Sequence, residues 1–241
     1  DLVLGLQPVV EIAPGRASRL LPHLVSQFAD ALTSGAFQNP LGDLQIEVDQ
    51  IVQDIVRDAV GDLIEINVDR GPVFSVWRPD LSTDLAQLRG LEQIMMDMYE
   101  APDKLHELVA FMSKTVLERQ AAAEKKGLWS LTTQANQAMC YCDDLEAPRA
   151  NSGPRKRKDL WCHLAAQEFT LVSPAMYEEF MLRHQLPIMS HFGFSAYGCC
   201  EDLTNKIDLL RRIPNLRTIS VTPSANVRRC AEQIGKDYVL S

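Results

Sequence analysis

The chain lacks the features that mark membrane proteins and nucleic-acid-binding proteins. No apolar run is long enough to span a bilayer, and no signal-peptide pattern precedes the first helix. The formal net charge is −8, whereas a nucleic-acid footprint requires clustered positive charge. The one basic run, Arg155–Lys158, is short and follows a turn sequence, so we interpret it as a solvated loop. We therefore expect no nucleic-acid partner and no membrane association.

Cysteine is too scarce for a secreted disulfide scaffold, with six residues in a chain of 241. The spacing of the cysteines does not match the CxxC pairs of a zinc ribbon, and we expect reduced thiols in a cytoplasmic protein. An initiating methionine is also absent. The chain opens on Asp1 and stops in a strand-like stretch, Asp237–Ser241, with no element after it to cover the strand. We therefore expect a fragment with both flanks missing.

Helical and strand-like segments alternate along most of the sequence. Apolar spacing predicts helices at about 17–33, 43–60, 85–100, 101–126, 159–171, 174–190, 203–213 and 225–234. Strand-like runs occupy 63–68, 72–77, 128–133, 191–199, 217–221 and 237–241. This alternation predicts βα units and a parallel sheet, and an α/β barrel commonly has about this length. The strands after residue 60 are too few for eight unless residues 1–14 supply the rest.

The stretch from His191 to Leu203 holds the strongest candidate site. Read as a strand, it places Phe192, Phe194 and Ala196 on one side and His191, Ser195, Tyr197 and Cys199 on the other. The first set suits a covering layer of helices. The second set is more polar and more reactive, and it suits the inside of a barrel near the open end of a strand.

Two adjacent cysteines stand where this strand meets the next predicted helix. A thiolate there would be favoured by the helix dipole. Zinc bound by Cys and His requires three or four ligands, and the candidates are Cys199, Cys200 and Glu201. Alternation puts the two cysteines on opposite sides unless the chain turns between them, which makes Cys199 the better ligand. His191 is too far upstream to join them. The alternative is that both cysteines pack as small hydrophobic residues.

Two adjacent carboxylates, Asp143 and Asp144, lie in the long predicted loop 135–158. Paired carboxylates can act as acid and base or bind a metal, so both are candidate catalytic residues. The commoner role of such a pair is in a turn or at a helix N-cap. A loop of this length in a compact domain is usually either functional or disordered.

Five further residues are candidates for binding a substrate. Gln134, Asn136 and Tyr141 could hydrogen-bond a ligand from the same region, although solvation is the alternative for each. Trp77 ends a predicted strand and could form an aromatic wall, but a core or rim position is equally consistent with the pattern. His163 lies on the helix predicted after the loop and could equally be a surface histidine.

Several motifs resemble the uroporphyrinogen decarboxylase-like superfamily. They are Tyr197–Leu203, Ile207–Arg217 and Ile219–Val221, together with Lys158–Trp161 and Val172–Phe180. The resemblance covers about residues 60–241 and is closest to a branch with a Tyr-Gly-Cys-Cys-Glu signature, which is often found beside corrinoid proteins. It implies a TIM (β/α)8 barrel, incomplete in this chain, as a single domain over 1–241 with its site at the C-terminal ends of the strands.

Relatives in this superfamily include zinc-dependent methyltransferases that move methyl groups between corrinoid proteins and thiols. They hold zinc with a His-x-Cys on one strand and a later Cys. Cys199 matches the first Cys, Tyr197 stands where the His would be, and the late ligand would fall beyond Ser241, since Cys230 lies in a predicted helix. A decarboxylase's Arg-rich N-terminal motif is absent from the sequence.

The resemblance therefore implies a methyltransferase of a corrinoid-dependent system. A small-molecule methyl donor and a corrinoid protein would be its partners, with zinc or a thiolate near Cys199 and with Tyr197 among the catalytic residues. Two alternatives stay open. One is a metal-free decarboxylase or lyase on the same barrel that uses Asp143 and Asp144, and the other is a non-catalytic partner of a corrinoid protein.

Overall fold

The computed structural model describes residues 43–64, 66, 81–131, 142–147, 149 and 151–241. The chain divides into two compact units, residues 1–68 and 69–241. The predicted strand at 72–77, the helix at 17–33 and the N-terminal stretch 1–14 lie outside the described residues.

The first unit contains one described helix, α2, over Asp43–Val60. This confirms the helix predicted at 43–60. The helix ends at Gly61, whose N–H donates to the Arg57 carbonyl at 2.8 Å. A Cβ at Gly61 would lie 2.5 Å from that same oxygen, so a residue without a side chain fits this end best. Residues 61–64 form a turn, where the sequence pattern predicted the start of a strand.

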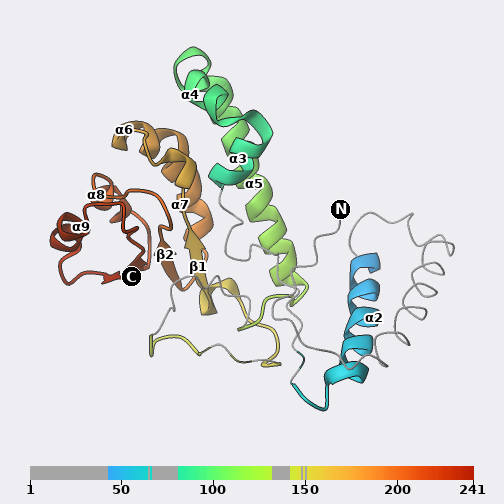
Figure 1. The fold of residues 1–241 in the computed structure, drawn as a ribbon. Helices are drawn as coiled ribbons and strands as arrows, with labels where there is room; N and C mark the ends of the chain where they lie inside the picture. The colour runs from blue at the N-terminus through green and yellow to red at the C-terminus, as the bar shows by residue number, and fades with distance from the viewer. Residues whose placement is uncertain (1–42, 65, 67–80, 132–141, 148, 150) are drawn as a thin grey trace, which may run out of the picture. The chain divides into compact units, whose positions relative to one another are not determined.

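The second unit is built on a parallel sheet of four strands, β1 Trp161–Leu164, β2 Phe194–Tyr197, β3 Leu216–Ile219 and β4 Val239–Leu240 (Figure 1). The strands are hydrogen-bonded in chain order, β1-β2-β3-β4, and all pairs are parallel. The predicted parallel sheet and α/β class are thereby confirmed. Because the order never reverses, the described strands form a singly wound sheet, in which right-handed crossovers place the connecting helices on one face.

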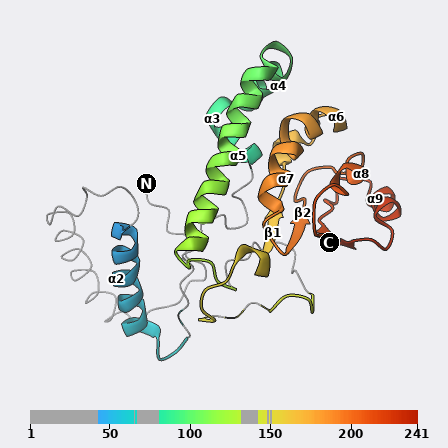
Figure 2. The same cartoon turned by 180° about the vertical axis from the view of Figure 1, so that it is seen from behind.

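Helices precede and connect these strands. Before the sheet come α3 Leu81–Arg89, α4 Leu91–Glu100 and α5 Pro102–Lys125. Between the strands lie α6 Pro174–Tyr177, the π-helical segment η4 Glu178–Leu182, α7 Arg183–Met189, α8 Ile207–Leu210 and α9 Val227–Ile234. Figure 2 shows the same arrangement from behind. The start predicted near residue 174 is confirmed, since Ser173 Oγ accepts the Met176 N–H and Pro174 is the first helical residue.

Two predicted elements in the second unit are wrong. The helix predicted over 159–171 is instead the strand β1, flanked by short 3-10 turns at Arg157–Asp159 and Gln167–Phe169. All four residues of β1 are buried, so the strand shows no polar alternation that would reveal it. Residues 128–131 form no strand in the described structure. The helix predicted at 203–213 shortens to the single turn α8.

The core fills the space between the sheet and its helices. Strand register pairs Cys162 with Ser195 and Leu164 with Tyr197, so these four side chains share one face. Cys162, Leu164 and Tyr197 join a single buried cluster with residues of α5, α7, α8 and α9. The opposite face carries Trp161, whose ring lies 5.4 Å from that of Phe194 between centroids.

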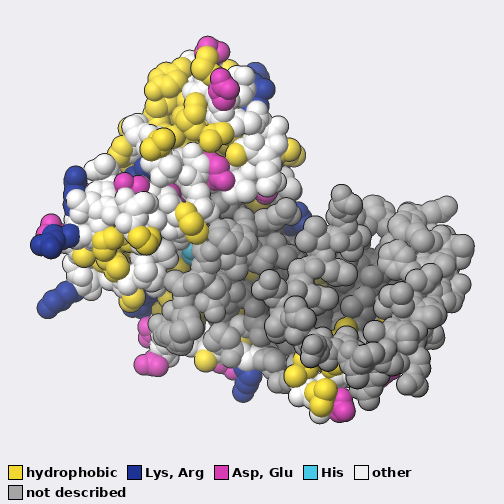
Figure 3. Space-filling view, viewed as in Figure 1, with side chains coloured by type: hydrophobic (Ala, Val, Ile, Leu, Met, Phe, Trp, Pro, Cys, Tyr) yellow, Lys and Arg dark blue, Asp and Glu magenta, His cyan; other side chains and the backbone are white. Residues whose placement is uncertain are grey.

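The surface of α3, α4 and α5 exposes several large apolar side chains, namely Leu88, Leu91, Met96, Tyr99 and Phe111. Hydrophobic side chains gather at the top of the space-filling view, over the region of α4 (Figure 3). Among the described residues, no helix combines the length and apolar character needed to cross a membrane.

Candidate functional site

The candidate site lies at the carboxyl edge of the sheet, where parallel strands release their loops on the same side. Gly198 follows β2 directly and has a φ of 103°, a conformation that residues with side chains rarely adopt. A Cβ there would lie 2.5 Å from the Ser220 carbonyl oxygen and 2.8 Å from Leu203 Cδ1. Glycine at this position therefore permits the tight turn that presents the next two residues.

Cys199 and Cys200 form a pair of adjacent cysteines just beyond this turn, and neither is in a disulfide. Their sulfur atoms are 3.4 Å apart, so the chain does turn between them and brings both thiols to one side. Cys199 is half-buried and Cys200 is exposed, whereas Cys162 and Cys230 are buried in the core. Burial raises the pKa of the Cys162 thiol, which leaves that residue protonated and inert. Of these four cysteines, the adjacent pair is therefore the one whose thiols a reactant could reach.

Glu201 holds the cysteine loop in place. Its side chain is buried, and Oε1 accepts the Ala166 N–H while Oε2 accepts the Cys199 N–H, both at 2.8 Å. Ala166 follows β1 closely, so this one carboxylate ties together the loops that leave β1 and β2. With both oxygens committed to backbone groups, Glu201 is a structural anchor in this conformation rather than the metal ligand predicted from the sequence.

His163 lies on β1 and not on the helix predicted for 159–171. It is buried, and its Nε2 is 2.8 Å from the carbonyl oxygen of Gly198, the residue before Cys199. Because a carbonyl only accepts, Nε2 carries the ring proton and Nδ1 presents a lone pair when the imidazole is neutral. In the part of the chain that the structure describes, Nδ1 has no hydrogen-bond partner. His163 is thus joined to the cysteine loop through Gly198.

Tyr197 faces the helices, so the side predicted for it is wrong. Its hydroxyl accepts from the Tyr177 hydroxyl at 2.7 Å and donates to Gln185 Oε1 at 2.8 Å. Gln185 Nε2 in turn donates to the Ala165 carbonyl. Alternation correctly predicts that neighbouring residues point in opposite directions, but it does not say which face the helices cover. Tyr197 is buried in the helix–sheet interface and its hydroxyl is engaged there.

Asp143 and Asp144 lie at the other edge of the sheet. Asp144 Oδ2 is 3.1 Å from an Arg217 guanidinium nitrogen, and that guanidinium stacks over the Phe194 ring at 4.3 Å. Phe194 begins β2, and the neighbouring Leu145 side chain lies against Gly193, just before that strand. The carboxylate pair is therefore at the amino edge, away from Cys199.

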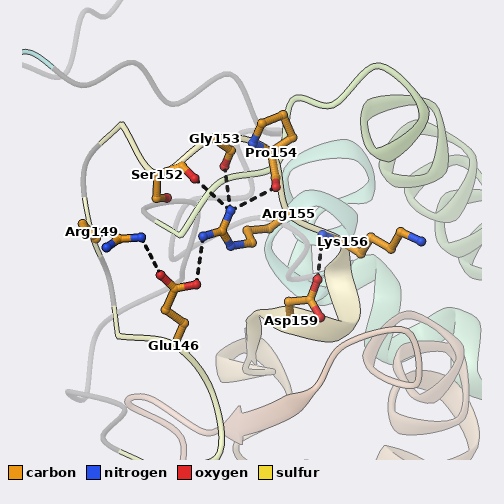
Figure 4. Close-up of polar contacts among 8 residues, drawn as sticks. All are labelled: Glu146, Arg149, Ser152, Gly153, Pro154, Arg155, Lys156 and Asp159. Atoms are coloured by element: carbon orange, nitrogen blue, oxygen red, sulfur yellow. Dashed lines mark hydrogen bonds and ion pairs between the residues drawn. The ribbon is translucent and has the colours of Figure 1, made fainter.

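The basic run is not simply solvated. Arg155 Nη1 donates to the carbonyls of Ser152 and Pro154 at 2.9 and 3.2 Å, and Nη2 lies 2.8 Å from Glu146 Oε2 (Figure 4). Arg157 is buried, and its Nε pairs with Glu124 at 3.0 Å. Two of the four cations are thus committed to internal contacts that fix the segment before β1.

A complete zinc site does not form from the described residues. Catalytic zinc takes three protein ligands and an open position. The cysteine pair supplies two sulfur atoms, and no group of three or more His, Cys, Asp or Glu side chains suited to a metal occurs in the described ranges. Trp77, Gln134, Asn136 and Tyr141, predicted as substrate contacts, lie outside those ranges.

Sequence reasoning missed the contacts that organise this edge. The His163–Gly198 and Glu201–Ala166 hydrogen bonds each join residues 35 positions apart, and nothing in the local pattern signals such a pairing.

Comparisons with known proteins add no relative, because no family model, curated protein or solved structure matches the chain.

Proposed function

We propose that this protein is a methyltransferase of a corrinoid-dependent methyl-transfer system, with Cys199 as its reactive thiol. The observation that carries the proposal is the accessible pair of thiols at the carboxyl edge of a singly wound parallel sheet. We further propose that the four strands form an arc of a TIM (β/α)8 barrel, since parallel strands added in chain order are what such a barrel requires. Barrel enzymes place their sites at this edge.

The chemistry proposed for this edge is nucleophilic attack on a methyl carbon. The Cys199 thiolate forms a sulfur–carbon bond, the cobalt–carbon bond of a methylated corrinoid breaks, and its electron pair stays on cobalt. The Glu201 carboxylate accepts the backbone N–H of Cys199, and this hydrogen bond limits the positions that the Cys199 sulfur can take. We assign no step to zinc, because the described residues supply two sulfur ligands and the Glu201 oxygens are occupied by backbone groups.

Single-turnover methylation tests the proposal. We expect the full chain, incubated with methylcobalamin, to acquire one methyl group on Cys199, detected by peptide mass spectrometry, while absorbance reports loss of the cobalt–carbon bond. Cys199→Ser is expected to reduce this reaction to the background of a free thiol. Cys142→Ser is the matched control, because Cys142 is also a partly exposed cysteine but lies beside Asp143 and Asp144, away from the cysteine edge.

Equal methylation of the Cys199→Ser chain would exclude the proposal. Co-purification with a methylated corrinoid protein, without any methyl transfer, would instead favour the non-catalytic partner. A decarboxylase that uses Asp143 and Asp144 gains no support from the geometry, since Asp144 pairs with Arg217 away from the cysteine edge.

A further inference from the structure

The two neighbouring cysteines at the carboxyl edge are placed for chemistry with each other. Cys199 Sγ and Cys200 Sγ are 3.4 Å apart, although adjacent side chains in an extended strand point in opposite directions. A disulfide bond requires these two sulfur atoms to approach by about 1.4 Å. Methyl transfer to Cys199 uses one thiol of the pair, so it does not account for a second thiol at this distance.

The two thiols differ in how far a reactant can reach them. Cys200 is exposed, whereas Cys199 is half-buried and its backbone N–H donates to Glu201 Oε2 at 2.8 Å. Cys162 and Cys230 are buried in the core, with exposed fractions of 4% and 0%. A small oxidant dissolved in water therefore meets the Cys200 sulfur first, and the Cys199 sulfur lies in contact with it.

The loop that carries the pair is held on both sides. Gly198 turns the chain with a φ of 103°, and the Glu201 carboxylate accepts the Cys199 N–H. After the pair, the Asp202 N–H donates to Thr170 Oγ1 at 2.9 Å. Because these contacts fix the backbone around the two thiols, little conformational freedom is lost when the thiols react with each other.

We propose that the cysteine pair is a reversible thiol–disulfide site for a low-molecular-weight disulfide. The Cys200 thiolate attacks one sulfur of that disulfide, a mixed disulfide forms, and the first small thiolate leaves. The Cys199 thiolate then attacks the Cys200 sulfur, the bond between the two cysteines forms, and the second small thiolate leaves. Two cysteine thiols are thereby oxidised and one small disulfide is reduced to two thiols. The two cysteine protons pass through solvent to the leaving thiolates.

The product is expected to be labile and not a permanent cross-link. Adjacent Cα atoms are about 3.8 Å apart across a trans peptide, whereas disulfide-bonded cysteines usually have Cα atoms about 4.4–6.8 Å apart. A disulfide between neighbours is therefore strained, and strained or exposed disulfides are the ones that thiols reduce readily. An excess of small thiol is expected to restore both cysteines.

Oxidation also controls the methyl transfer proposed above, and this consequence rests on the proposed function. The disulfide leaves no thiol on Cys199, so the methyl group of a methylated corrinoid has no acceptor there. Reduction restores that acceptor. The pair thus makes the reaction depend on the ratio of small thiol to small disulfide.

Peptide mass spectrometry of the full chain tests the site. The reduced protein is incubated with oxidised glutathione, quenched with N-ethylmaleimide and digested with trypsin, which releases both cysteines and no other in peptide 184–206. We expect this peptide to lose two hydrogens and to take no alkyl group. Dithiothreitol added before the quench is expected to reverse the change.

Single variants identify the order of attack. Cys199→Ser is expected to accumulate glutathione on Cys200, because the resolving thiol is gone. Cys200→Ser is expected to acquire glutathione on Cys199 about tenfold more slowly, because Cys199 is half-buried. Cys142→Ser removes a partly exposed cysteine outside the pair, and as the matched control it is expected to form the same disulfide as the wild type.

Three results overturn the inference. They are a wild-type peptide that stays reduced, glutathione that persists on Cys200 in the wild type, and equal rates of glutathione addition in the two single variants. The wild-type reading depends on no variant, so a variant that does not fold leaves the test intact.

Methylation is read separately, with methylcobalamin added to the reduced chain and to the oxidised chain. We expect a methyl group on Cys199 in the reduced chain only. A methyl group on Cys199 in both would overturn the control of methyl transfer. Its absence from the reduced chain would count against the proposed function, whereas the disulfide site is decided by the peptide masses alone.

Discussion

Tyr197 is the middle member of a buried chain of hydrogen bonds at the helix–sheet interface. Its hydroxyl provides the acceptor that Tyr177 uses and the donor that Gln185 Oε1 uses, and all three residues are at most 1% exposed. Tyr197→Phe removes both contacts and leaves polar atoms without these partners in a site closed to water. We expect a loss of about 1–3 kcal/mol in the free energy of unfolding, measured by urea denaturation.

Tyr177→Phe provides the comparison for that measurement. Tyr177 donates to the Tyr197 hydroxyl, so removing the Tyr177 hydroxyl leaves the donation from Tyr197 to Gln185 intact. The cost is expected to be smaller, about 0.5–1.5 kcal/mol. If Tyr197→Phe were no more destabilising than Tyr177→Phe, the middle position would not have the role assigned to it.

The cysteine pair shows what the sequence predicts at this scale and what it does not. Residue type and position identified Cys199 and Cys200 as candidate ligands at a strand end, and the structure places both just beyond β2, with Cys199 half-buried and Cys200 exposed. The turn that brings both sulfurs together depends on Gly198, whose positive φ and close approach to Ser220 and Leu203 explain why that residue is glycine. Ser220 follows a different strand, so local pattern could not reveal the contact.

At the scale of elements, Glu201 connects the loops that follow β1 and β2. Its two oxygens accept the Ala166 and Cys199 N–H groups, so Glu201→Gln must turn its amide NH2 group toward one of these donors. We expect this variant to lower the free energy of unfolding by about 2–3 kcal/mol, since hydrogen bonds to a charged group are among the stronger ones. Hydrogen exchange is expected to show faster opening at the Cys199 amide.

Glu232→Gln is the control for this change. Glu232 is exposed on α9, and its substitution is expected to alter stability by about 0.5 kcal/mol or less. An equal effect of the two substitutions would show that Glu201 does not hold the two loops together.

Helices were the elements best predicted from the sequence. The amphipathic spacing of 43–60 and the Pro-initiated segment near 102 are local signals, and α2 and α5 have nearly the predicted bounds. β1 was missed because Trp161–Leu164 is covered on both faces, so its composition resembles that of a buried helix segment. Its identity as a strand comes from pairing with β2, which is a long-range contact.

At the scale of the whole molecule, the alternation of strands and helices predicts a parallel sheet but not the placement of its loops. The loop carrying Asp144 reaches Arg217 across 73 positions and so joins the amino edge, opposite the cysteine pair. Loop conformation is determined by contacts with distant elements, and periodicity carries no information about those contacts. The sequence alone therefore could not predict that Asp144 lies at the amino edge of the sheet and the cysteine pair at the carboxyl edge.

The stability of the whole molecule is expected to fall in two stages on acidification. The pKa of Asp97 is lowered by hydrogen bonds from Arg89 and Gln93, and the pKa of Asp202 is lowered by hydrogen bonds from Thr204. Each carboxylate stabilises the fold above its ordinary pKa, and this contribution is lost as the pH falls through the lowered value. These groups therefore produce a loss below about pH 4.

His184 adds an earlier stage. In the unfolded chain its ring takes a proton near pH 6.5, but in the folded chain it stays neutral down to about pH 4, because burial and the neighbouring His106 and Arg183 disfavour the charge. The stability present above about pH 6.5 is therefore lost progressively as the pH falls toward 4. Since the ring is only half-buried, we expect a loss of about 1 kcal/mol between pH 7 and pH 5.

Urea denaturation with a chelator present should show this loss in the wild type and a flatter profile in His184→Gln, whereas both proteins should lose stability below pH 4. An identical slope between pH 7 and pH 5 in the two proteins would rule out His184 as its source.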